Sequence, residues 1–394
     1  MLPPITLRFG RALVRAALLL TLLAVAASGC AAKAPTPQPA PPQELPTRTP
    51  KATFTPVPTA TTAPTLTPRP SATAAPTATE APSATLVPTR DANLSPLTGL
   101  PLSDPALARR RVLAARIGND PIIRPQEGLG QADIVYEEIM DGWTITRFTA
   151  LYLDSDVQRI RPIRSARLSS LAITPQYDAA LVHSGASDKI RWLISQAKFV
   201  DLDQFFHEAP YGVLAGFDWR GRIYTSVAAV HDYLRAKGLE RDAPIEPLLF
   251  DAAAPAGQPA PSVHIPYPQL CVVDWTYSAD KGAYLRAQQG QPHLEALDSQ
   301  QIAAQNVIIL YTEHRKTDIV EDSLGSTAID IVFDGTGRAQ VLRDGVVVDG
   351  YWARLAADRP IAYFCDAAHT QPIALKPGKT WIQLVPPDYQ VAIK

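Results

Sequence analysis

Apolar and polar residues recur at strand spacing near the middle of the chain. The stretches ADIVYEEI and TRFTALYL, residues 132–139 and 146–153, carry β-branched and aromatic residues in the pattern of strands. Asp141 and Gly142 lie between them, and this dipeptide is typical of a tight turn. The pattern therefore predicts a hairpin.

Strand-like and helix-like stretches then alternate as far as residue 239. The short stretch IRPI comes first, and AALVH is apolar enough for a buried strand. Helices are expected near Ser165, after Ser187 and after Thr225 or Ser226, with Pro175 ending the first and Gly238 ending the last. The expected elements are a strand at 160–163, a helix at 165–173, a strand at 179–183 and helices at 188–198 and 224–239. This order predicts an α/β domain, with a mixed sheet and flanking helices.

The C-terminal third has a different pattern, rich in strands. Strand-like stretches follow one another from Val263, and glycines at 335, 337, 345 and 378 mark turns. A single helix is expected at 294–305. A proline- and alanine-rich join, DAAAPAGQPAPS, separates the two regions. The predicted organisation is an α/β domain at 93–250, a linker at 251–262 and a β-rich domain at 263–394.

The N-terminus has the layout of a secretory signal peptide over residues 1–29. Three arginines precede an apolar segment, residues 16–27, and Ser28 and Gly29 lead into Cys30. The apolar segment is shorter than the ~20 residues that a membrane-spanning helix needs. A cysteine at the cleavage site indicates lipid attachment, so the mature chain is expected outside the cytoplasm, lipid-anchored to the cell membrane. The alternative is an ordinary cleaved signal with an incidental cysteine.

Residues 30–92 are expected to form a disordered tether after the lipidated cysteine. Residues 31–90 contain 15 Pro, 15 Thr and 13 Ala, and no Gly or Cys. Such a segment buries too little apolar surface to offset the entropy of the chain. Because proline favours an extended helix with ~3.1 Å per residue, the tether reaches on the order of 100–190 Å at full stretch.

The net charge argues against a nucleic-acid partner. Residues 93–394 carry 29 Lys and Arg against 35 Asp and Glu, a net charge of −6. A domain with this balance has no overall basic field to attract nucleic acid. The cysteines of this part, Cys271 and Cys365, lie in apolar strand-like stretches. They are expected either to form a disulfide or to remain as buried thiols.

An arginine cluster is the best candidate for a binding site. Four arginines fall within QRIRPIRSAR, residues 158–167, and the last two flank the start of an expected helix. Guanidinium groups and free helix N–H groups both bind phosphate or carboxylate. The turn HSGAS at 183–187 joins a strand to a helix, where ligands bind in open α/β sheets. The predicted ligand-binding residues are Arg147, Arg164, Arg167, Ser184, Gly185 and Ser187.

Three further residues are candidates for acid, base or metal-ligand roles. These are Asp133, Glu137 and His183. Each has a structural alternative, because an aspartate often caps a turn and a histidine at a strand end is often a satisfied structural group. The sequence lacks the common nucleophile, phosphate-loop and zinc motifs, and its seven histidines are scattered. No metal site and no cofactor are predicted.

The sequence resembles the YerB-like lipoproteins, whose paired domains are of unknown function. The matching stretches in the first region are SPLTGLP, RPQEGLGQADIVYE, TRFTALY, RPIRSAR and YDAALVHSGAS. In the second region they are YLRAQQGQPH, QQIAAQNVII and LKPGKTWIQLVP. They cover nearly all of residues 95–387 in the same order. The resemblance implies a membrane-anchored envelope protein with no assigned reaction.

A shorter resemblance concerns the LytR-CpsA-Psr phosphotransferases, which transfer wall polymers from polyprenyl-pyrophosphate carriers. ADIVY, IRPIRSAR and ALVHSGAS are similar to stretches of that family over about 60 residues, with Asp133 and Arg164 or Arg167 in matching positions. This resemblance implies arginines that neutralise a pyrophosphate and carboxylates that hold Mg²⁺.

Three hypotheses follow for the function. The first is an anchored envelope protein that binds an anionic cell-wall component through the arginine cluster. The second is a phosphotransferase-like enzyme at the same cluster, with Mg²⁺ as cofactor. The third is a scaffold whose β-rich domain docks another envelope protein and which has no small-molecule site.

Overall fold

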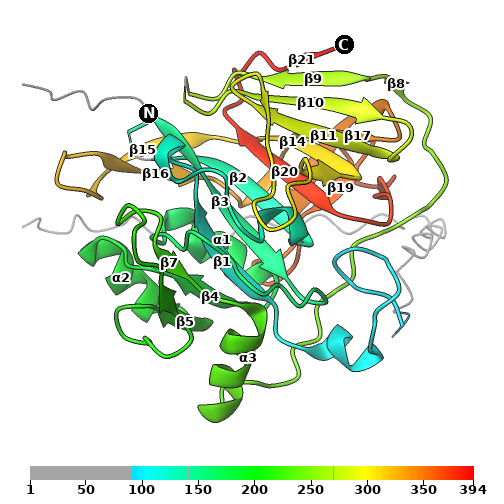
Figure 1. The fold of residues 1–394 in the computed structure, drawn as a ribbon. Coiled ribbons are helices and arrows are strands. Elements are labelled where there is room, and N and C mark those ends of the chain that lie inside the picture. The colour runs from blue at the N-terminus through cyan, green and yellow to red at the C-terminus, as the bar shows by residue number, and fades with distance from the viewer. Residues whose placement is uncertain (1–90, 92, 141, 269) are drawn as a thin grey trace, which may run out of the picture. The chain divides into compact units, whose positions relative to one another are not determined.

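The computed structural model describes residues 91, 93–140, 142–268 and 270–394 (Figure 1). The predicted signal peptide, Cys30 and the tether up to residue 90 lie outside the described residues. Within the described part, no helix has the length and apolar character needed to cross a membrane.

Strands make up most of the regular structure. The helices are α1 (Leu168–Gln176), α2 (Asp188–Ser195) and α3 (Val227–Ala236), with short 3₁₀ turns at Pro105–Arg109, Pro121–Ile123 and Leu129–Gln131. The strands are β1 (Leu113–Gly118), β2 (Ile134–Met140), β3 (Ile145–Tyr152), β4 (Ala180–His183), β5 (Val200–Asp203), β6 (Gly212–Val213), β7 (Ile223–Tyr224), β8 (Gln258–Pro259), β9 (Ser262–Ile265), β10 (Val273–Ser278), β11 (Ala283–Gln288), β12 (Gln291–Pro292), β13 (Ala303–Ala304), β14 (Asn306–Tyr311), β15 (His314–Val320), β16 (Thr327–Ile331), β17 (Gly335–Arg343), β18 (Val346–Arg354), β19 (Ala362–Phe364), β20 (Thr380–Val385) and β21 (Ala392–Ile393).

A large mixed sheet of 11 strands runs through both regions of the sequence. Its order is β19-β18-β17-β14-β20-β2-β3-β1-β4-β5, and β8 pairs with β18. The expected fold class is confirmed, because the first region combines this sheet with helices and the second is β-rich. The two regions nevertheless share one sheet, since β2 lies parallel to β20 with Val135 opposite Trp381. Part of the predicted linker at 251–262 also belongs to this sheet, because β8 lies within the linker and pairs with β18.

The predicted hairpin is present as β2 and β3. The strands pair antiparallel, and Gly142 in the turn has φ of +66°, a conformation that favours glycine. All residues of both strands are buried, because other elements cover both faces. On one face Tyr136 meets Tyr177 at the end of α1, with 2.8 Å between the hydroxyl oxygens.

A smaller sheet covers the other face of this hairpin. It contains β12-β11-β10-β9-β21, with β13 beside β11, and β9, β10 and β11 lie together near β20 in Figure 1. Trp275 from β10 packs against Trp381 from β20, with ring centroids 5.3 Å apart. Phe148 from β3 contacts the same Trp381 ring at 5.5 Å. The main hydrophobic core thus includes residues from both regions, and it extends from the space between the two sheets to the face covered by the helices.

The three predicted helices form, with shifted ends. In α3, the Ser226 hydroxyl accepts a hydrogen bond from the Ala229 N–H at 3.1 Å, and Gly238 has φ of +65° beyond the end. The first helix begins at Leu168, because Ser165 remains in the preceding extended segment. Pro175 lies inside the last turn of the helix rather than beyond its end. Proline disrupts little there, because few helical hydrogen bonds remain to be formed after it.

The expected helix at 294–305 is wrong. Leu294 pairs with Gln301 in an isolated bridge, and the segment ends in the short strand β13. Ser299 has φ of +59°, which interrupts a helix. The Glu295 carboxylate instead accepts hydrogen bonds from the N–H groups of Gly128 and Gly130, both at 2.8 Å. Contacts with the first region therefore override the local pattern.

Candidate functional site

One edge of the large sheet gathers the segments that the sequence singles out. β1, β4 and β5 are parallel, so their carboxyl ends, Gly118, His183 and Asp203, lie at the same edge. The arginine-rich segment crosses this edge, because the Arg164 N–H donates to the Arg116 carbonyl at 2.8 Å. The Ser184 N–H in turn donates to the Arg164 carbonyl at 3.0 Å. The structure thus brings the predicted arginine cluster and the HSGAS turn together.

Two of the predicted ligand-binding arginines point into the protein. Arg147 is 1% exposed, and its Nη1 donates to the Ser165 carbonyl at 3.1 Å. Arg167 is 8% exposed, and its Nε lies 2.8 Å from an oxygen of Glu321, which follows β15. The expectation of an open anion site at these two side chains is therefore corrected. Acceptors from the chain itself occupy positions that a ligand would need.

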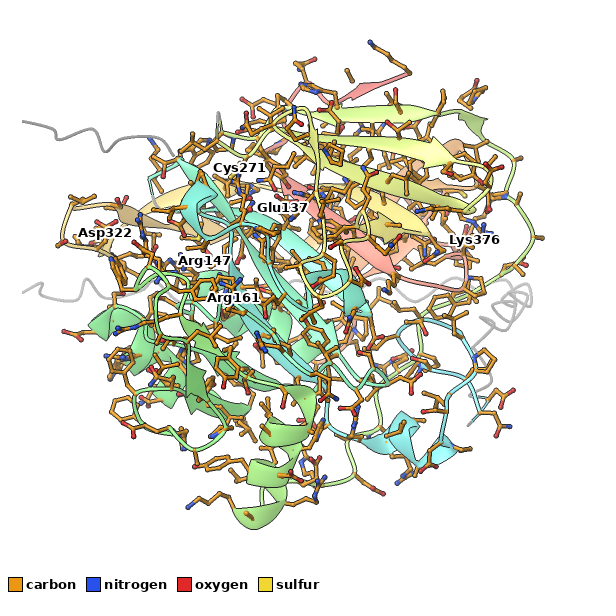
Figure 2. All side chains as sticks on the ribbon, viewed as in Figure 1. Glu137, Arg147, Arg161, Cys271, Asp322 and Lys376 are labelled. Carbon is orange, nitrogen blue, oxygen red and sulfur yellow. The ribbon has the colours of Figure 1, made fainter. Side chains whose placement is uncertain are left out.

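Beside these arginines lies a second buried ion pair, between β1 and β2. Arg116 contacts Glu138, and both side chains are almost fully buried. Burial lowers the pKa of Arg116, while the Glu138 carboxylate opposes that effect. Glu138 is also the register partner of Arg147. The face of the sheet below α1 therefore holds a group of buried charges, of which Arg147 is labelled in Figure 2.

Arg164 differs from the other two because it is partly exposed. Its side chain passes over Gly118, where an added Cβ would lie 2.6 Å from Arg164 Cγ. Its guanidinium stacks 5.2 Å from the ring centroid of Trp219, whose exposure is 64%. Next to it, Arg220 donates to Asp218 at 2.8 Å and lowers the pKa of that carboxyl to about 2.

The HSGAS turn is engaged by an internal carboxylate. Gly185 has φ of +78°, and its N–H donates to Asp203 Oδ1 at 2.9 Å. The other Asp203 oxygen accepts from Arg191 Nε at 2.9 Å. Ser184 donates to the Gln204 side chain at 3.2 Å, and Ser187 precedes α2 without a capping bond from its hydroxyl. The backbone amide that was expected to bind a ligand thus binds Asp203.

The three catalytic candidates do not come together. Asp133 lies just before β2, at the edge opposite the carboxyl ends, where its Oδ2 accepts from the Leu153 N–H at 2.7 Å. Burial raises the pKa of Asp133 to about 6. His183, at the end of β4, is fully buried between the Gly185 carbonyl at 2.9 Å and Asp201 at 2.7 Å. Glu137 lies on the opposite face of β2 from Glu138.

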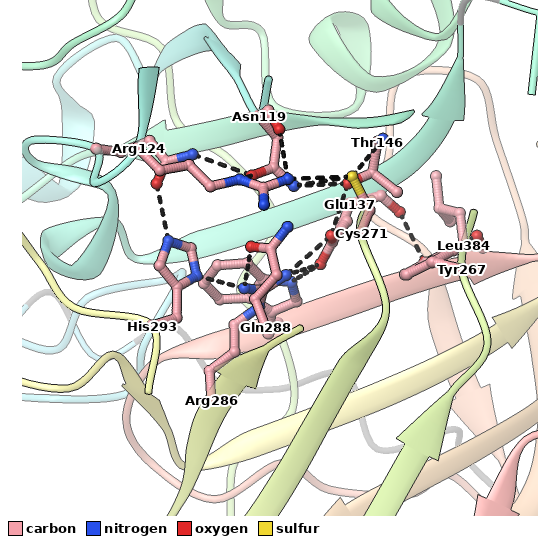
Figure 3. A network of polar contacts seen from close by, with 12 residues as sticks. Asn119, Arg124, Glu137, Thr146, Tyr267, Cys271, Arg286, Gln288, His293 and Leu384 are labelled. Carbon is pink, nitrogen blue, oxygen red and sulfur yellow. Dashed lines mark hydrogen bonds and ion pairs between the residues drawn. The ribbon is translucent and has the colours of Figure 1, made fainter. Parts of the chain in front are cut away.

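Glu137 is the centre of a buried polar network that sequence reasoning did not identify (Figure 3). Arg286 Nη2 lies 2.9 Å from each of its carboxylate oxygens, and both side chains are 0% exposed. Thr146 donates to the same carboxylate at 2.8 Å and Trp381 at 3.2 Å. Arg286 belongs to β11, so the network joins the two sheets. Its burial indicates a structural role.

Histidine, amide and thiol groups extend this network. His293 Nε2 lies 2.8 Å from the Gln126 side-chain oxygen, and burial beside Arg286 lowers the pKa of His293 well below its usual value. Cys271 accepts from the Thr146 N–H at 3.2 Å, and burial raises the pKa of its thiol. Cys365 is exposed, and both cysteines are free. Neither alternative for these cysteines holds in full, because no disulfide links them and only Cys271 is a buried thiol.

Exposed aromatic residues form the feature that the sequence analysis missed. We call Lys189, Arg191, Trp192, Phe205 and Phe206 the α2 cluster, and Arg161, Arg164, Phe217, Trp219 and Arg220 the Arg164 cluster. The α2 cluster lies beside the HSGAS turn, since a Cβ on Gly185 would be 3.1 Å from the Phe205 ring. The sequence contains an indication of both clusters. The stretches QFFHEAP and GFDWRGR place aromatic residues in polar segments that lack the periodicity of a strand or a helix.

Within the described residues, no group of three or more histidine, cysteine, aspartate or glutamate side chains is arranged to hold a metal ion.

Comparison with known families identifies the class of protein. Residues 97–240 match the family described as "Protein of unknown function (DUF3048) N-terminal domain", and residues 263–382 match its C-terminal domain. Together the matches cover well over half of the chain. The chain therefore belongs to the DUF3048 family, which confirms the resemblance found in the sequence.

One relative matches in both sequence and structure. The Bacillus subtilis (strain 168) protein named "Putative lipoprotein YerB" is 28% identical over 308 residues, which cover 74% of this chain and 86% of that protein. The crystal structure of YerB protein from Bacillus subtilis superposes with a TM-score of 0.64 at 25% identity. It covers 76% of this chain and 99% of the solved chain. The fold is thus common to both proteins.

Proposed function

We propose that this protein is a lipid-anchored component of the cell envelope which binds an anionic ligand outside the cytoplasm. The proposed location is supported by the signal-like N-terminus that ends at Cys30 and by the name of the Bacillus relative. The ligand class rests on the Arg164 cluster. Its position at the carboxyl ends of β1 and β4 is the place where open α/β sheets bind ligands.

One observation carries the anion-binding proposal. Of the three arginines expected to bind the ligand, Arg164 alone keeps a partly exposed side chain, and it stacks on the exposed ring of Trp219 at 5.2 Å. A guanidinium that lies against an aromatic ring is oriented by it, and a partly exposed guanidinium lies within reach of a phosphate or carboxylate in solution. Asp133 and Glu137 lie away from this cluster, so we propose binding rather than phosphotransfer.

Titration with a soluble polyanion tests the binding proposal. Residues 91–394 contain the whole described core, and the solved relative, which was crystallised as a folded chain, covers 76% of this sequence. This soluble fragment is titrated with sodium polyphosphate in a calorimeter. Arg164→Gln should weaken binding at least fivefold, the loss of about one charge-assisted hydrogen bond. Arg359→Gln, in an exposed ion pair with Glu246, is the matched control and should leave binding unchanged.

Equal affinities of Arg164→Gln, Arg359→Gln and the parent would show that the anion site is misplaced. Absence of polyphosphate binding by the parent at low salt would refute the proposal itself. For the anchor, Cys30→Ser in the full chain should move the protein from the membrane fraction to the soluble fraction or leave the signal uncleaved. Unchanged membrane association and processing would refute lipid attachment.

A further inference from the structure

We infer that the α2 cluster and the Arg164 cluster together dock on the surface of an anionic lipid bilayer. This inference rests on the proposed function and identifies the anionic ligand as phospholipid headgroups. The occupant is a membrane surface rather than a soluble polymer or a second protein. Three observations lead to this choice.

The first observation is the distribution of exposed aromatic residues. Among the described residues, every exposed phenylalanine or tryptophan lies within residues 192–219. The exposed fractions are 54% for Trp192, 61% for Phe205, 70% for Phe206, 49% for Phe217 and 64% for Trp219. The other phenylalanines and tryptophans of the described part are buried or half-buried. Concentrated exposure of this kind marks a surface that contacts a protein or a membrane.

The second observation is that a cation accompanies each of these rings. Lys189 lies 3.9 Å from the Trp192 centroid, and Arg191 lies 4.9 Å from Phe205 and 5.4 Å from Phe206. In the other cluster, Arg164 pairs with Trp219, while Arg161 lies 4.4 Å from Phe217 but is only 4% exposed and is bound to Glu127, so it supports that ring from below the surface. At a membrane interface, tryptophan and phenylalanine insert at headgroup depth while lysine and arginine reach the phosphates. A repeated pairing of aromatic ring and cation fits that interface.

The third observation concerns acidic residues within the two clusters. Asp203 is 1% exposed and is bound by Arg191 and by the Gly185 amide. Asp218 is bound by Arg220 through two side-chain contacts of 2.8 and 3.3 Å. Each of these two pairs is neutral as a whole, so it neither opposes nor adds to attraction by anionic lipid, whereas Lys189 is exposed and is in none of the ion pairs of the described residues. The positive charge of Lys189 beside the Trp192 ring therefore favours an anionic bilayer over a neutral surface.

The expected lipid anchor makes such docking geometrically accessible. The tether expected from the sequence lies outside the described residues, and a reach on the order of 100–190 Å would allow the folded part to turn any face toward the membrane. Because the anchor keeps the local concentration of membrane high, even weak docking would fix the orientation of the domain. The sheet edge that carries the HSGAS turn would then face the lipid headgroups.

Vesicle sedimentation of the soluble fragment 91–394 tests this inference without the anchor. The fragment should sediment with vesicles of phosphatidylglycerol and phosphatidylcholine, less with added sodium chloride, and not with pure phosphatidylcholine. The double variant Phe205→Ser with Phe206→Ser should lower partitioning about tenfold, because two exposed rings no longer insert. Lys189→Glu should lower it about fivefold or more through the lost attraction to anionic lipid.

Leu355→Ser is the matched control, since Leu355 is 66% exposed and lies outside both clusters. It should sediment as the parent does. Thermal melting checks that each variant folds, and Trp192→Ser replaces the double variant if that variant is unfolded. Lipid-dependent blue shift of tryptophan emission should accompany binding in the parent, because Trp192 and Trp219 enter the interface.

The outcomes separate this inference from the proposed function. Binding of polyphosphate without binding of anionic vesicles overturns the docking inference and leaves the proposed function intact. Binding of neither overturns both. Equal sedimentation of the folded aromatic variants and Leu355→Ser overturns the assignment of the docking surface. Equal binding to pure phosphatidylcholine overturns the anionic requirement.

Discussion

Replacing Glu137 with glutamine should destabilise the protein strongly, because the change leaves a buried cation without its counter-ion. Arg286 is 0% exposed, and both Glu137 oxygens lie 2.9 Å from its Nη2. Its other side-chain partners include Gln288 and His293, and neither carries a negative charge. Removal of one member of a buried pair costs about 3–5 kcal/mol. That is a large part of the ~5–15 kcal/mol by which most domains are stable.

Urea unfolding of the fragment 91–394, followed by tryptophan fluorescence, measures this loss. Trp275 and Trp381 are suitable probes, because their ring centroids lie 5.9 and 4.9 Å from the Arg286 guanidinium carbon. The double variant Glu137→Leu with Arg286→Met removes both charges. It should recover to within about 1–2 kcal/mol of the parent, since apolar residues often replace a buried pair at little cost. Glu313→Gln, in an exposed pair, should match the parent.

Two results would refute this reasoning. A loss below about 1 kcal/mol for Glu137→Gln would mean that water or another group compensates Arg286. A double variant as unstable as the sum of the single variants would mean that the two charges are not coupled. A stable Glu137→Gln variant would also revive the hypothesis that this carboxylate has a chemical rather than a structural role.

Three further predictions concern a buried acid, a glycine contact and the two thiols. Burial raises the pKa of Asp133 in the folded state to about 6, above its ordinary value of 3.8. As the pH rises from 4 to 7, the parent should therefore lose up to about 3 kcal/mol of stability relative to Asp133→Asn. A constant difference between the two proteins in urea unfolding across this range would contradict the raised pKa. Gly118→Ala should displace Arg164 and cost about 1–3 kcal/mol, with weaker polyphosphate binding; unchanged binding and melting would contradict the contact. Cys365 should react with a thiol reagent in the folded fragment and Cys271 only after unfolding; no reactive thiol in unreduced, denatured protein would indicate a disulfide.

The sequence pattern was sufficient to predict those elements whose structure depends on residues close together in the chain. The hairpin of β2 and β3 needs only two strand-like stretches and a turn at Gly142. The helix α3 is delimited by Ser226 and Gly238, whose roles act within a few residues. The adjacency of the arginine segment and the HSGAS turn follows from the parallel pairing of β1 and β4; the sequence pattern predicted the strand at 179–183, but no strand was expected at the position of β1.

Contacts between distant residues were not predictable from local patterns. The arginine pattern gave no information about Glu321, which meets Arg167 from the loop after β15. Nor did it reveal that Asp203 would bind the Gly185 amide. The amino-acid sequence of an arginine-rich segment is the same whether the arginines bind an acidic ligand or a carboxylate from a remote part of the chain. The helix expected at 294–305 failed for the same reason, since Glu295 is held by glycines more than 160 residues away.

The pairing of β2 with β20 has a consequence for how the chain is made. Glu137 and its contact Trp381 are 244 positions apart, so the first strand emerges from the ribosome long before its neighbour exists. At ~5–20 residues per second, that delay is roughly 10–50 s. A gene fragment that stops near residue 250 would leave an apolar strand edge permanently uncovered, and it should accumulate as aggregates rather than as a half-sized product.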